Sequence, residues 1–404
     1  MKILIIDYIY TPSQILKNQA IAFSEHIEAI DSVKNLKESY PKATVIHTKK
    51  NSVLYAGFIN SHVHLEFSTN KTSLKYGSFM PWLESVIERR EELVGACNNE
   101  VMKKACQTML RSGITSFGAI SSFGNELEVC EKTPQRVVFF NELIGSNASY
   151  ADMLYRDFME RVKASMSCEE KSLITPAIAI HSPYSVHPII LEKAVNLAKH
   201  HHLPLSAHLL ESEAEKKWLE KGEGEFKPFF EKYFNTSTPV TTIKKFMEAF
   251  DNYPTHFTHC TEAEEKELNY LALKNHSIAH CPRSNRYLGC KRLKIETLNL
   301  PFTIATDGLS SNDSLNIFDE LRASLFLHNK IDIQTLAPQL IEAVTSTPAK
   351  VLDLNCGEIS VGKLADFAII SLSETPIREE EIALWTILHT KEVDAVYIGG
   401  EKVE

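Results

Sequence analysis

Residues 57–67, GFINSHVHLEF, place two histidines two positions apart in an otherwise apolar run. Side chains at positions i and i+2 of a β-strand point to the same face, so His62 and His64 would direct both imidazoles toward one point. That arrangement suits two ligands of one metal ion. The alternative is a pair of hydrogen-bonded core or surface histidines, and the polar residues of the other strands decide between the two.

This stretch opens a regular alternation of short apolar runs and longer amphipathic ones. The predicted strands are 54–62, 113–120, 136–145, 173–182, 203–212, 254–261, 276–285 and 301–311. The predicted helices are 79–94, 100–112, 151–166, 188–201, 240–250, 262–275, 313–328 and 333–345. Eight strands that alternate with helices favour a closed parallel barrel over an open sheet. We therefore expect an α/β fold, a distorted (β/α)8 TIM barrel over residues 54–356.

The two ends of the chain lack this rhythm. Residues 1–53 carry short β-rich pieces, and residues 357–404 carry GEISVGKLADFAII and VDAVYIGGEKV. The simplest arrangement pairs both ends as one small β-sandwich domain beside the barrel.

The composition limits the class of protein. A net charge of −9 over 404 residues argues against a nucleic-acid binder with a basic face. No apolar run approaches the ~18 residues of a membrane span, and the first ten residues do not resemble a signal peptide. The eight cysteines form no CxxC pair and are expected to be reduced thiols. We expect a cytoplasmic protein without nucleic-acid or membrane partners.

Polar residues interrupt the predicted strands near their carboxyl ends. These residues are His62, His64, His181, His208, His259, His280 and Asp307. In a (β/α)8 barrel this end carries the active site, because the loops that follow the strands open there. Buried imidazoles cost desolvation free energy unless they are paired, so the interior gives no other reason for so many of them. The pattern predicts an active site at this end.

His62, His64, His208 and Asp307 would form a nitrogen-rich site with one carboxylate. Such a set suits Zn²⁺ or Fe²⁺ better than Mg²⁺ or Ca²⁺, which prefer oxygen ligands. Water bound to such an ion has its pKa lowered toward ~7. The alternative for Asp307 is a turn residue that begins the segment GLSSND. We favour the metal site because Asp307 directly follows the apolar run PFTIAT.

Two further residues would move protons. Glu211 lies three residues beyond His208 in HLLES, where a buried carboxyl would carry a proton to the substrate. The alternative is an ordinary glutamate at a helix N-terminus. His259 in FTHCT is expected to take the proton of the attacking water together with Asp307. His181 and Arg283 are expected to touch the substrate, with a core histidine and a surface arginine as alternatives of nearly equal weight.

Six motifs together resemble the amidohydrolase superfamily, in its branch of mononuclear-metal deaminases. They are GFINSHVH, SAHLLES, THC, HCPRSN, TDGLSSND and GKLADFAII, and the resemblance covers essentially the whole chain. It implies one divalent metal ion, Zn²⁺ or Fe²⁺, because no lysine interrupts the fourth strand to bridge two ions. It also implies that Glu211 protonates a ring nitrogen of an aminated heterocycle. His259 and Asp307 would accept the proton of water, and ammonia would leave.

Within this branch, FMPWLESVIERREEL (79–93) with HCPRSNRYLG resembles the subgroup that converts 6-amino-6-deoxyfutalosine to futalosine in menaquinone biosynthesis. The resemblance implies a small nucleoside partner with a ribose and a benzoate-like carboxylate. Arg283 or His181 would meet the carboxylate. Glu91 would bind ribose hydroxyls unless it is a solvated helix-face charge, and Trp82 would contact the substrate unless it packs against the barrel.

Several alternatives stay open from the sequence. S-adenosylhomocysteine, methylthioadenosine, other purines and a triazine-like ring that loses chloride all suit the same site. A non-catalytic metal-binding scaffold is disfavoured because Glu211, His259 and Asp307 are all present. A homodimer is also left open.

Overall fold

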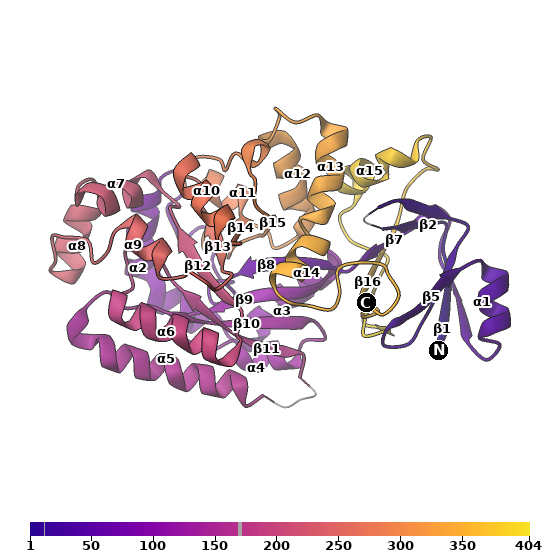
Figure 1. Cartoon of the computed structure of the whole chain (residues 1–404), viewed down its shortest axis with the longest axis horizontal. Coiled ribbons are helices and arrows are strands. Elements are labelled where there is room, and N and C mark those ends of the chain that lie inside the picture. Colours follow the sequence, from indigo (N-terminus) through magenta and orange to yellow (C-terminus); the bar gives the residue numbers. More distant parts are fainter. Residues whose placement is uncertain (12, 169–171) are drawn as a thin grey trace.

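Eight parallel strands form one sheet in chain order, and the sheet closes into a barrel (Figure 1). The computed structural model describes residues 1–11, 13–168 and 172–404. The barrel strands are β8 (Phe58–Val63), β9 (Ile114–Ser121), β10 (Arg136–Leu143), β11 (Ile174–Ile180), β12 (Leu205–Leu209), β13 (His256–His259), β14 (Ser277–His280) and β15 (Phe302–Ile304). The Asp307 backbone N–H donates to the His62 carbonyl at 3.1 Å, and the Ser61 and Thr303 hydroxyls lie 2.7 Å apart. These contacts join the first and last strands, and the predicted barrel is confirmed.

Helices follow the strands and cover the barrel. They are α2 (Phe79–Ala96), α3 (Asn99–Arg111), α4 (Leu127–Lys132), η1 (Ala148–Tyr150), α5 (Ala151–Met166), α6 (Pro188–His201), α7 (Glu213–Lys221), α8 (Phe226–Phe234), α9 (Ile243–Glu248), α10 (Glu265–Leu273), α11 (Pro282–Tyr287), η2 (Ile295–Thr297), α12 (Ile317–Leu327), α13 (Ile333–Glu342) and α14 (Ser346–Val351). In α6 the buried residues Ile190, Ala194 and Ala198 recur every four positions. Such a stripe packs one face of a helix against a sheet.

Each of the eight predicted strand ranges overlaps one barrel strand, but several ends are wrong. The predicted strand 276–285 ends at His280, because Pro282 opens α11 at a position where a helix tolerates proline. The predicted strand 203–212 ends at Leu209, because Leu210 takes a left-handed conformation with φ of 50°. The prediction also missed α7 and α8, which lie between β12 and β13.

The predicted strand 54–62 is in fact two strands. β7 (Ser52–Ala56) pairs with β16 (Phe367–Ser371) in a second sheet, and β8 begins the barrel. Gly57 lies between them, and a Cβ there would be 2.1 Å from the Thr115 side-chain oxygen. Only glycine therefore lets the chain pass from one sheet to the other at this point.

Both ends of the chain build a small β unit beside the barrel (Figure 1). A six-stranded sheet has the order β18-β17-β16-β7-β2-β3, and a four-stranded sheet has the order β5-β4-β1-β6. The remaining elements are β1 (Lys2–Ile5), β2 (Tyr8–Tyr10), β3 (Ile15–Lys17), β4 (Ala20–Phe23), β5 (Ile27–Asp31), α1 (Val33–Ser39), β6 (Thr44–His47), η3 (Glu379–Glu381), α15 (Ile382–His389), β17 (Ala395–Ile398) and β18 (Glu401–Lys402).

One apolar core joins these two sheets. Phe23 packs edge-on against Phe367 and Tyr397, with ring centroids 5.3 Å and 5.8 Å apart. The predicted β-sandwich from both termini is therefore confirmed. Its division from the barrel at residues 53/54 and 356/357 stays a prediction.

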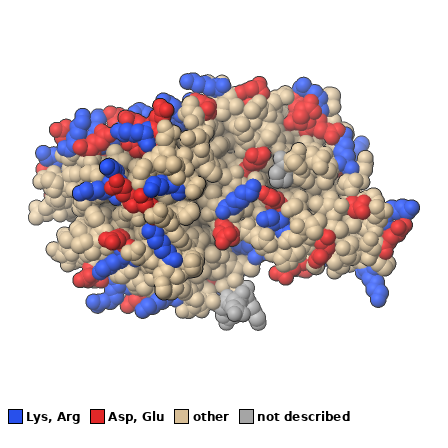
Figure 2. All heavy atoms as spheres, viewed as in Figure 1, with Lys and Arg blue, Asp and Glu red and all other residues tan. Residues whose placement is uncertain are grey.

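Basic and acidic side chains are mixed over the face of the molecule that Figure 2 shows. Of the helices in the described ranges, none combines the length and the apolar character that a membrane crossing requires.

Candidate active site

The carboxyl end of the barrel brings three predicted histidines together. One ring nitrogen each of His62, His64 and His208 lies within 4.8 Å of the other two. The Nε2 atoms of His62 and His64 face Asp307 Oδ1 at 3.8 Å and 3.6 Å. Among the described residues, none hydrogen-bonds His62 Nε2, which is buried. An unpaired buried nitrogen is costly, so the three imidazoles and the carboxylate fit a divalent cation such as Zn²⁺ or Fe²⁺.

Hydrogen bonds on the far side of two rings fix how they point. His208 Nδ1–H donates to the His181 carbonyl oxygen at 2.6 Å, and His62 Nδ1 lies 3.2 Å from the Thr258 hydroxyl. Burial and the neighbouring histidines lower the pKa of His62 well below its usual value. Burial also lowers the pKa of His208 to about 3. Both rings therefore stay neutral, and with Nδ1 engaged outside the cluster each has Nε2 left for a metal ion.

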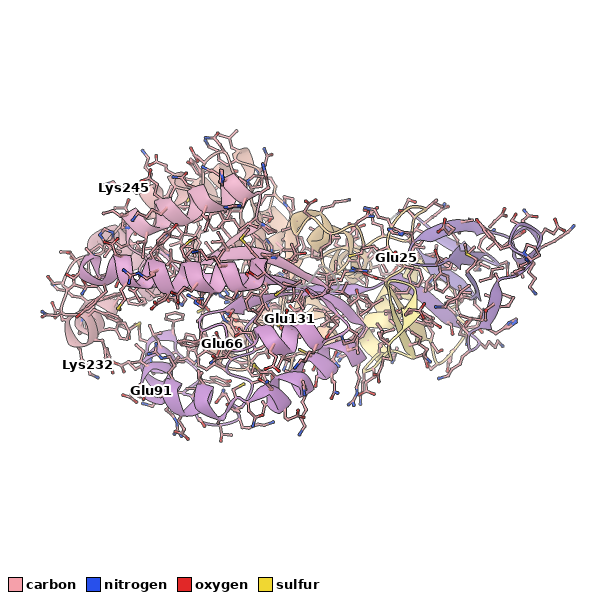
Figure 3. All side chains as sticks on the ribbon, turned by 90° about the horizontal axis from the view of Figure 1, so that it is seen from below. Glu25, Glu66, Glu91, Glu131, Lys232 and Lys245 are labelled. Carbon is pink, nitrogen blue, oxygen red and sulfur yellow. The ribbon has the colours of Figure 1, made fainter. Side chains whose placement is uncertain are left out.

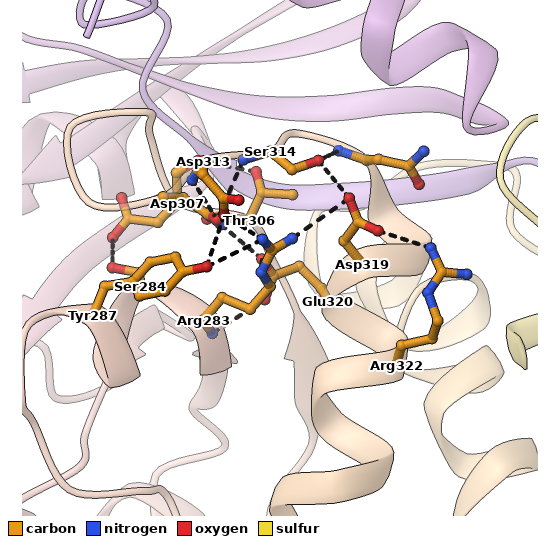
Figure 4. A network of polar contacts seen from close by, with 12 residues as sticks. Arg283, Ser284, Tyr287, Thr306, Asp307, Asp313, Ser314, Asp319, Glu320 and Arg322 are labelled. Carbon is orange, nitrogen blue, oxygen red and sulfur yellow. Dashed lines mark hydrogen bonds and ion pairs between the residues drawn. The ribbon is translucent and has the colours of Figure 1, made fainter. Parts of the chain in front are cut away.

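Three donors hold the Asp307 carboxylate, and Figure 4 shows one of them, the Ser284 hydroxyl. The Gly308 N–H donates to Oδ1 at 2.8 Å, and the hydroxyls of Ser284 and Ser311 donate to Oδ2 at 2.7 Å and 3.1 Å. Burial opposes ionisation, but His64, His259 and the Ser284 hydroxyl outweigh it and lower the pKa of Asp307. The carboxylate is therefore charged and has Oδ1 turned toward the histidines.

Gly308 permits this approach. A Cβ at Gly308 would lie 2.8 Å from His64 Cβ and 2.9 Å from the His64 carbonyl oxygen. The segment after β15 can therefore touch the end of β8 only with glycine at this position.

Glu211 and His259 face each other beside this cluster. His259 Nε2 lies 3.4 Å from Glu211 Oε1 and 4.0 Å from Asp307 Oδ2. Burial, followed by the charges of Asp307 and Glu215, raises the pKa of Glu211 well above its usual value. Burial lowers the pKa of His259 to about 4. Burial thus favours the protonated form of the Glu211 carboxyl and the neutral form of the His259 imidazole, which are an acid and a base within reach of one site.

The Asn285 side-chain amide lies 2.9 Å from His259 Nδ1. Asn285 is buried, and its Oδ1 has no partner among the described residues when the NH₂ group faces the ring. With the amide turned over, Oδ1 accepts the Nδ1–H of His259. That orientation satisfies the amide oxygen and leaves Nε2 free to accept a proton.

The residues predicted to touch the substrate lie in different surroundings. The His181 ring is 5.3 Å from that of His208 and hydrogen-bonds the Ser185 hydroxyl at 2.5 Å, so His181 borders the cluster. Trp82 Nε1–H donates to the Ser310 carbonyl at 2.8 Å, which ties α2 to the segment after β15. Glu91 is exposed on α2 (Figure 3). Glu66, which follows His64 by two positions in the sequence, is buried instead (Figure 3).

Arg283 does not face the cluster as a free cation. Its guanidinium contacts Asp313, lies 3.5 Å from Asp319 Oδ2 and 3.9 Å from Glu320 Oε1 (Figure 4). Three carboxylates already surround it, so the geometry gives no support to a contact with a substrate carboxylate.

Sequence reasoning missed the residues that hold the site in place. They are Thr258, Ser284, Asn285 and Ser311. Each lies one to four positions from a predicted site residue, often within the same short motif. This proximity in the sequence could have indicated them. Left-handed backbone at Leu210, His259, Cys260 and Asp307 also marks the ends of three strands. Such strain in residues other than glycine gathers at functional sites.

A parallel eight-stranded barrel with three imidazoles, a carboxylate and an acid–base pair at its carboxyl end defines a class of metal-dependent hydrolase. The chain belongs to the amidohydrolase family, whose pattern matches residues 53–403. The resemblance indicated by the sequence motifs is confirmed. The chain is thus a hydrolytic enzyme of a family that generally uses a divalent metal ion.

Known proteins resemble the chain along its whole length. The aminodeoxyfutalosine deaminase of a Nitratiruptor species is 45% identical over 98% of this chain and 97% of that protein. The structure of Helicobacter pylori aminofutalosine deaminase with methylthio-coformycin superimposes with a TM-score of 0.95 and 33% identity, and both chains are covered completely. A zinc-bound adenosine deaminase from Xanthomonas campestris shares the fold, with a TM-score of 0.81 and 21% identity over 99% of this chain and 92% of that one.

Proposed function

We propose that the chain catalyses the hydrolytic deamination of an adenine-containing nucleoside, converting 6-amino-6-deoxyfutalosine and water to futalosine and ammonia. The observation that carries this proposal is the buried Glu211 carboxyl, 3.4 Å from His259 Nε2 and beside the histidine cluster. Such a pair can give a proton to a ring nitrogen and take one from water, as replacement of an aromatic amino group by oxygen requires.

The relatives support the choice of substrate. The Nitratiruptor protein, named for deamination of aminodeoxyfutalosine, shares 45% identity with this chain. The H. pylori structure contains methylthio-coformycin, which supports methylthioadenosine-type nucleosides as a second candidate.

His62, His64, His208 and Asp307 would hold one Zn²⁺ or Fe²⁺ ion. The ion supplies a Lewis acid that promotes the ionisation of water at neutral pH. His62 Nε2 has no partner in the described part of the chain, and His208 makes a hydrogen bond on its far side; both observations support these ligands. His181 borders the same cluster and is proposed to contact the substrate. Contacts of Trp82, Glu91 and Arg283 with the substrate stay predictions.

The chain's own residues would move protons in a fixed order. Glu211 gives its carboxyl proton to N1 of the adenine ring, which makes the amino-bearing carbon electrophilic. As the oxygen of water bonds to that carbon, Nε2 of His259 takes the proton of the water, with Asp307 next to it. His259 then returns a proton to the amino group. The carbon–nitrogen bond breaks and ammonia leaves. The remaining hydroxyl proton passes to the Glu211 carboxylate, so the ring keeps a carbonyl oxygen and Glu211 is protonated again.

A panel of nucleosides tests the proposal. Adenosine, methylthioadenosine, S-adenosylhomocysteine and 6-amino-6-deoxyfutalosine are compared by kcat/KM with an ammonia-release assay on metal-replete protein. We expect the highest kcat/KM for 6-amino-6-deoxyfutalosine. If none of the four releases ammonia, the proposed deaminase activity is refuted. A higher kcat/KM for methylthioadenosine would make that nucleoside the preferred substrate instead.

A further inference from the structure

The turn after β12 is held by a buried carboxylate that no step above uses. Glu215 lies in the first turn of α7 and is 1% exposed. Its Oε1 accepts the Leu210 backbone N–H at 2.8 Å, and its Oε2 accepts the Glu211 backbone N–H at 2.7 Å. Ser212 caps the helix by accepting the Glu215 N–H at 3.2 Å. The side chain thus extends beyond the usual capping box, to the two residues before the cap.

The carbonyl groups of the same two residues are held by the segment after β13. The Glu262 N–H donates to the Leu210 carbonyl at 3.0 Å, and the Thr261 hydroxyl donates to the Glu211 carbonyl at 2.7 Å. Leu210 has φ of 50°, a conformation that costs an L-residue about 1–2 kcal/mol. A strained turn persists only where its surroundings fix it from several sides.

We infer that Glu215 is a positioning residue for Glu211: its carboxylate fixes the Leu210–Glu211 peptides so that the Glu211 carboxyl faces His259 and the substrate ring. This inference rests on the proposed function, because it assigns Glu215 a role in proton transfer by Glu211. Such transfer requires heavy atoms about 2.6–3.2 Å apart. A displacement of about 1 Å costs roughly 100-fold in rate, so a small rotation of this turn would be felt in turnover.

The alternative is that Glu215 only stabilises the start of α7. The chain offers a matched case in α10, where Glu267 accepts the Glu264 backbone N–H at 2.9 Å and is also buried. Glu267 therefore also caps a helix with its carboxylate. The backbone N–H that it accepts belongs to Glu264, which is not one of the proposed catalytic residues.

The experiment is a double-mutant cycle of Glu215→Gln and Glu211→Gln, with Glu267→Gln as the control. A glutamine keeps the size of the side chain but has one acceptor oxygen for two N–H donors. We expect E215Q to lower kcat about 10- to 100-fold, with KM and bound metal unchanged. In the E211Q background the same change should add less than about twofold, because Glu215 would act only through Glu211. E267Q should keep wild-type kcat and lose only thermal stability.

Equal losses from E215Q in both backgrounds, or wild-type kcat in E215Q, would overturn the inference. If E215Q does not fold, Thr261→Val tests the carbonyl side of the turn, and Thr261→Ser should retain activity because it keeps the hydroxyl. T261V with wild-type kcat would then overturn the inference. Failure of the proposed function looks different, because wild-type protein would release no ammonia or E211Q would turn over normally.

Discussion

Replacing Ser284 by alanine should weaken metal binding without touching a ligand. Ser284 donates its hydroxyl to Asp307 Oδ2 at 2.7 Å in a buried site. Ser311 remains as the second donor to the same oxygen, at 3.1 Å. The carboxylate of S284A is thus still held, but less firmly and with one oxygen poorly satisfied.

The expected size follows from the charge on Asp307. A hydrogen bond to a charged group contributes about 1.5–3 kcal/mol, and 1.4 kcal/mol corresponds to tenfold in an equilibrium constant. Loss of the Ser284 bond should therefore lower the affinity for Zn²⁺ roughly 10- to 100-fold, as is typical for residues that orient metal ligands. Removing Ser311 as well should lower it further, because the two hydroxyls share one acceptor oxygen.

Competition with a chromogenic chelator measures this affinity in wild-type protein, S284A and S284A/S311A. Ser314→Ala is the matched control. Ser314 lies after β15 in the same segment as Asp307 and Ser311, but its hydroxyl donates to Asp319 at 2.6 Å. S314A should bind Zn²⁺ like wild type. An S284A affinity within about twofold of wild type would refute the idea that the donors to Oδ2 set the position of the Asp307 carboxylate.

Three further changes test the rest of the site. E211Q should keep its bound metal and lower kcat by about 10²–10⁴-fold, because the proton donor is lost; normal ammonia release would exclude Glu211 as that donor. Removal of the metal ion by a chelator should abolish ammonia release and lower Tm, since His62 Nε2 then stays unpaired, and added Zn²⁺ or Fe²⁺ should restore both; undiminished turnover in the metal-free protein would contradict the metal role. Arg283→Met should destabilise folding by about 1–3 kcal/mol in urea titrations, because it removes the guanidinium beside the buried Glu320 carboxyl, with KM unchanged. A raised KM at unchanged stability would instead support the contact with a substrate carboxylate that the sequence indicates.

The barrel and the centre of the site could be predicted because both follow simple periodicities. His62 and His64 are two positions apart in a strand, and Asp307 follows an apolar run, so their common end was visible in the sequence. The sandwich could be predicted because neither terminal segment shares the strand–helix rhythm.

The supporting residues could not be predicted in this way, because they depend on backbone that leaves the strand. Ser284 and Asn285 lie in α11, which begins at Pro282. The predicted strand 276–285 wrongly included this part of the helix. Glu215 reaches back to a turn made by the left-handed Leu210. The ion-pair partners of Arg283 could not be predicted, because Asp319 and Glu320 lie more than thirty residues further along the chain.

The contacts between the first and last barrel strands, β8 and β15, form a seam that closes the barrel, and this seam affects the order of folding. The hydroxyl contact between Ser61 and Thr303 joins residues 242 positions apart, and the metal-site prediction draws its ligands from both sides of that seam. Contacts so distant in sequence form late and slowly, because the intervening chain must first be ordered. A growing polypeptide that has not yet delivered β15 therefore lacks the carboxylate of the ion site. Capture of the ion would mark the completion of the barrel and would make detachment of its last strand unfavourable.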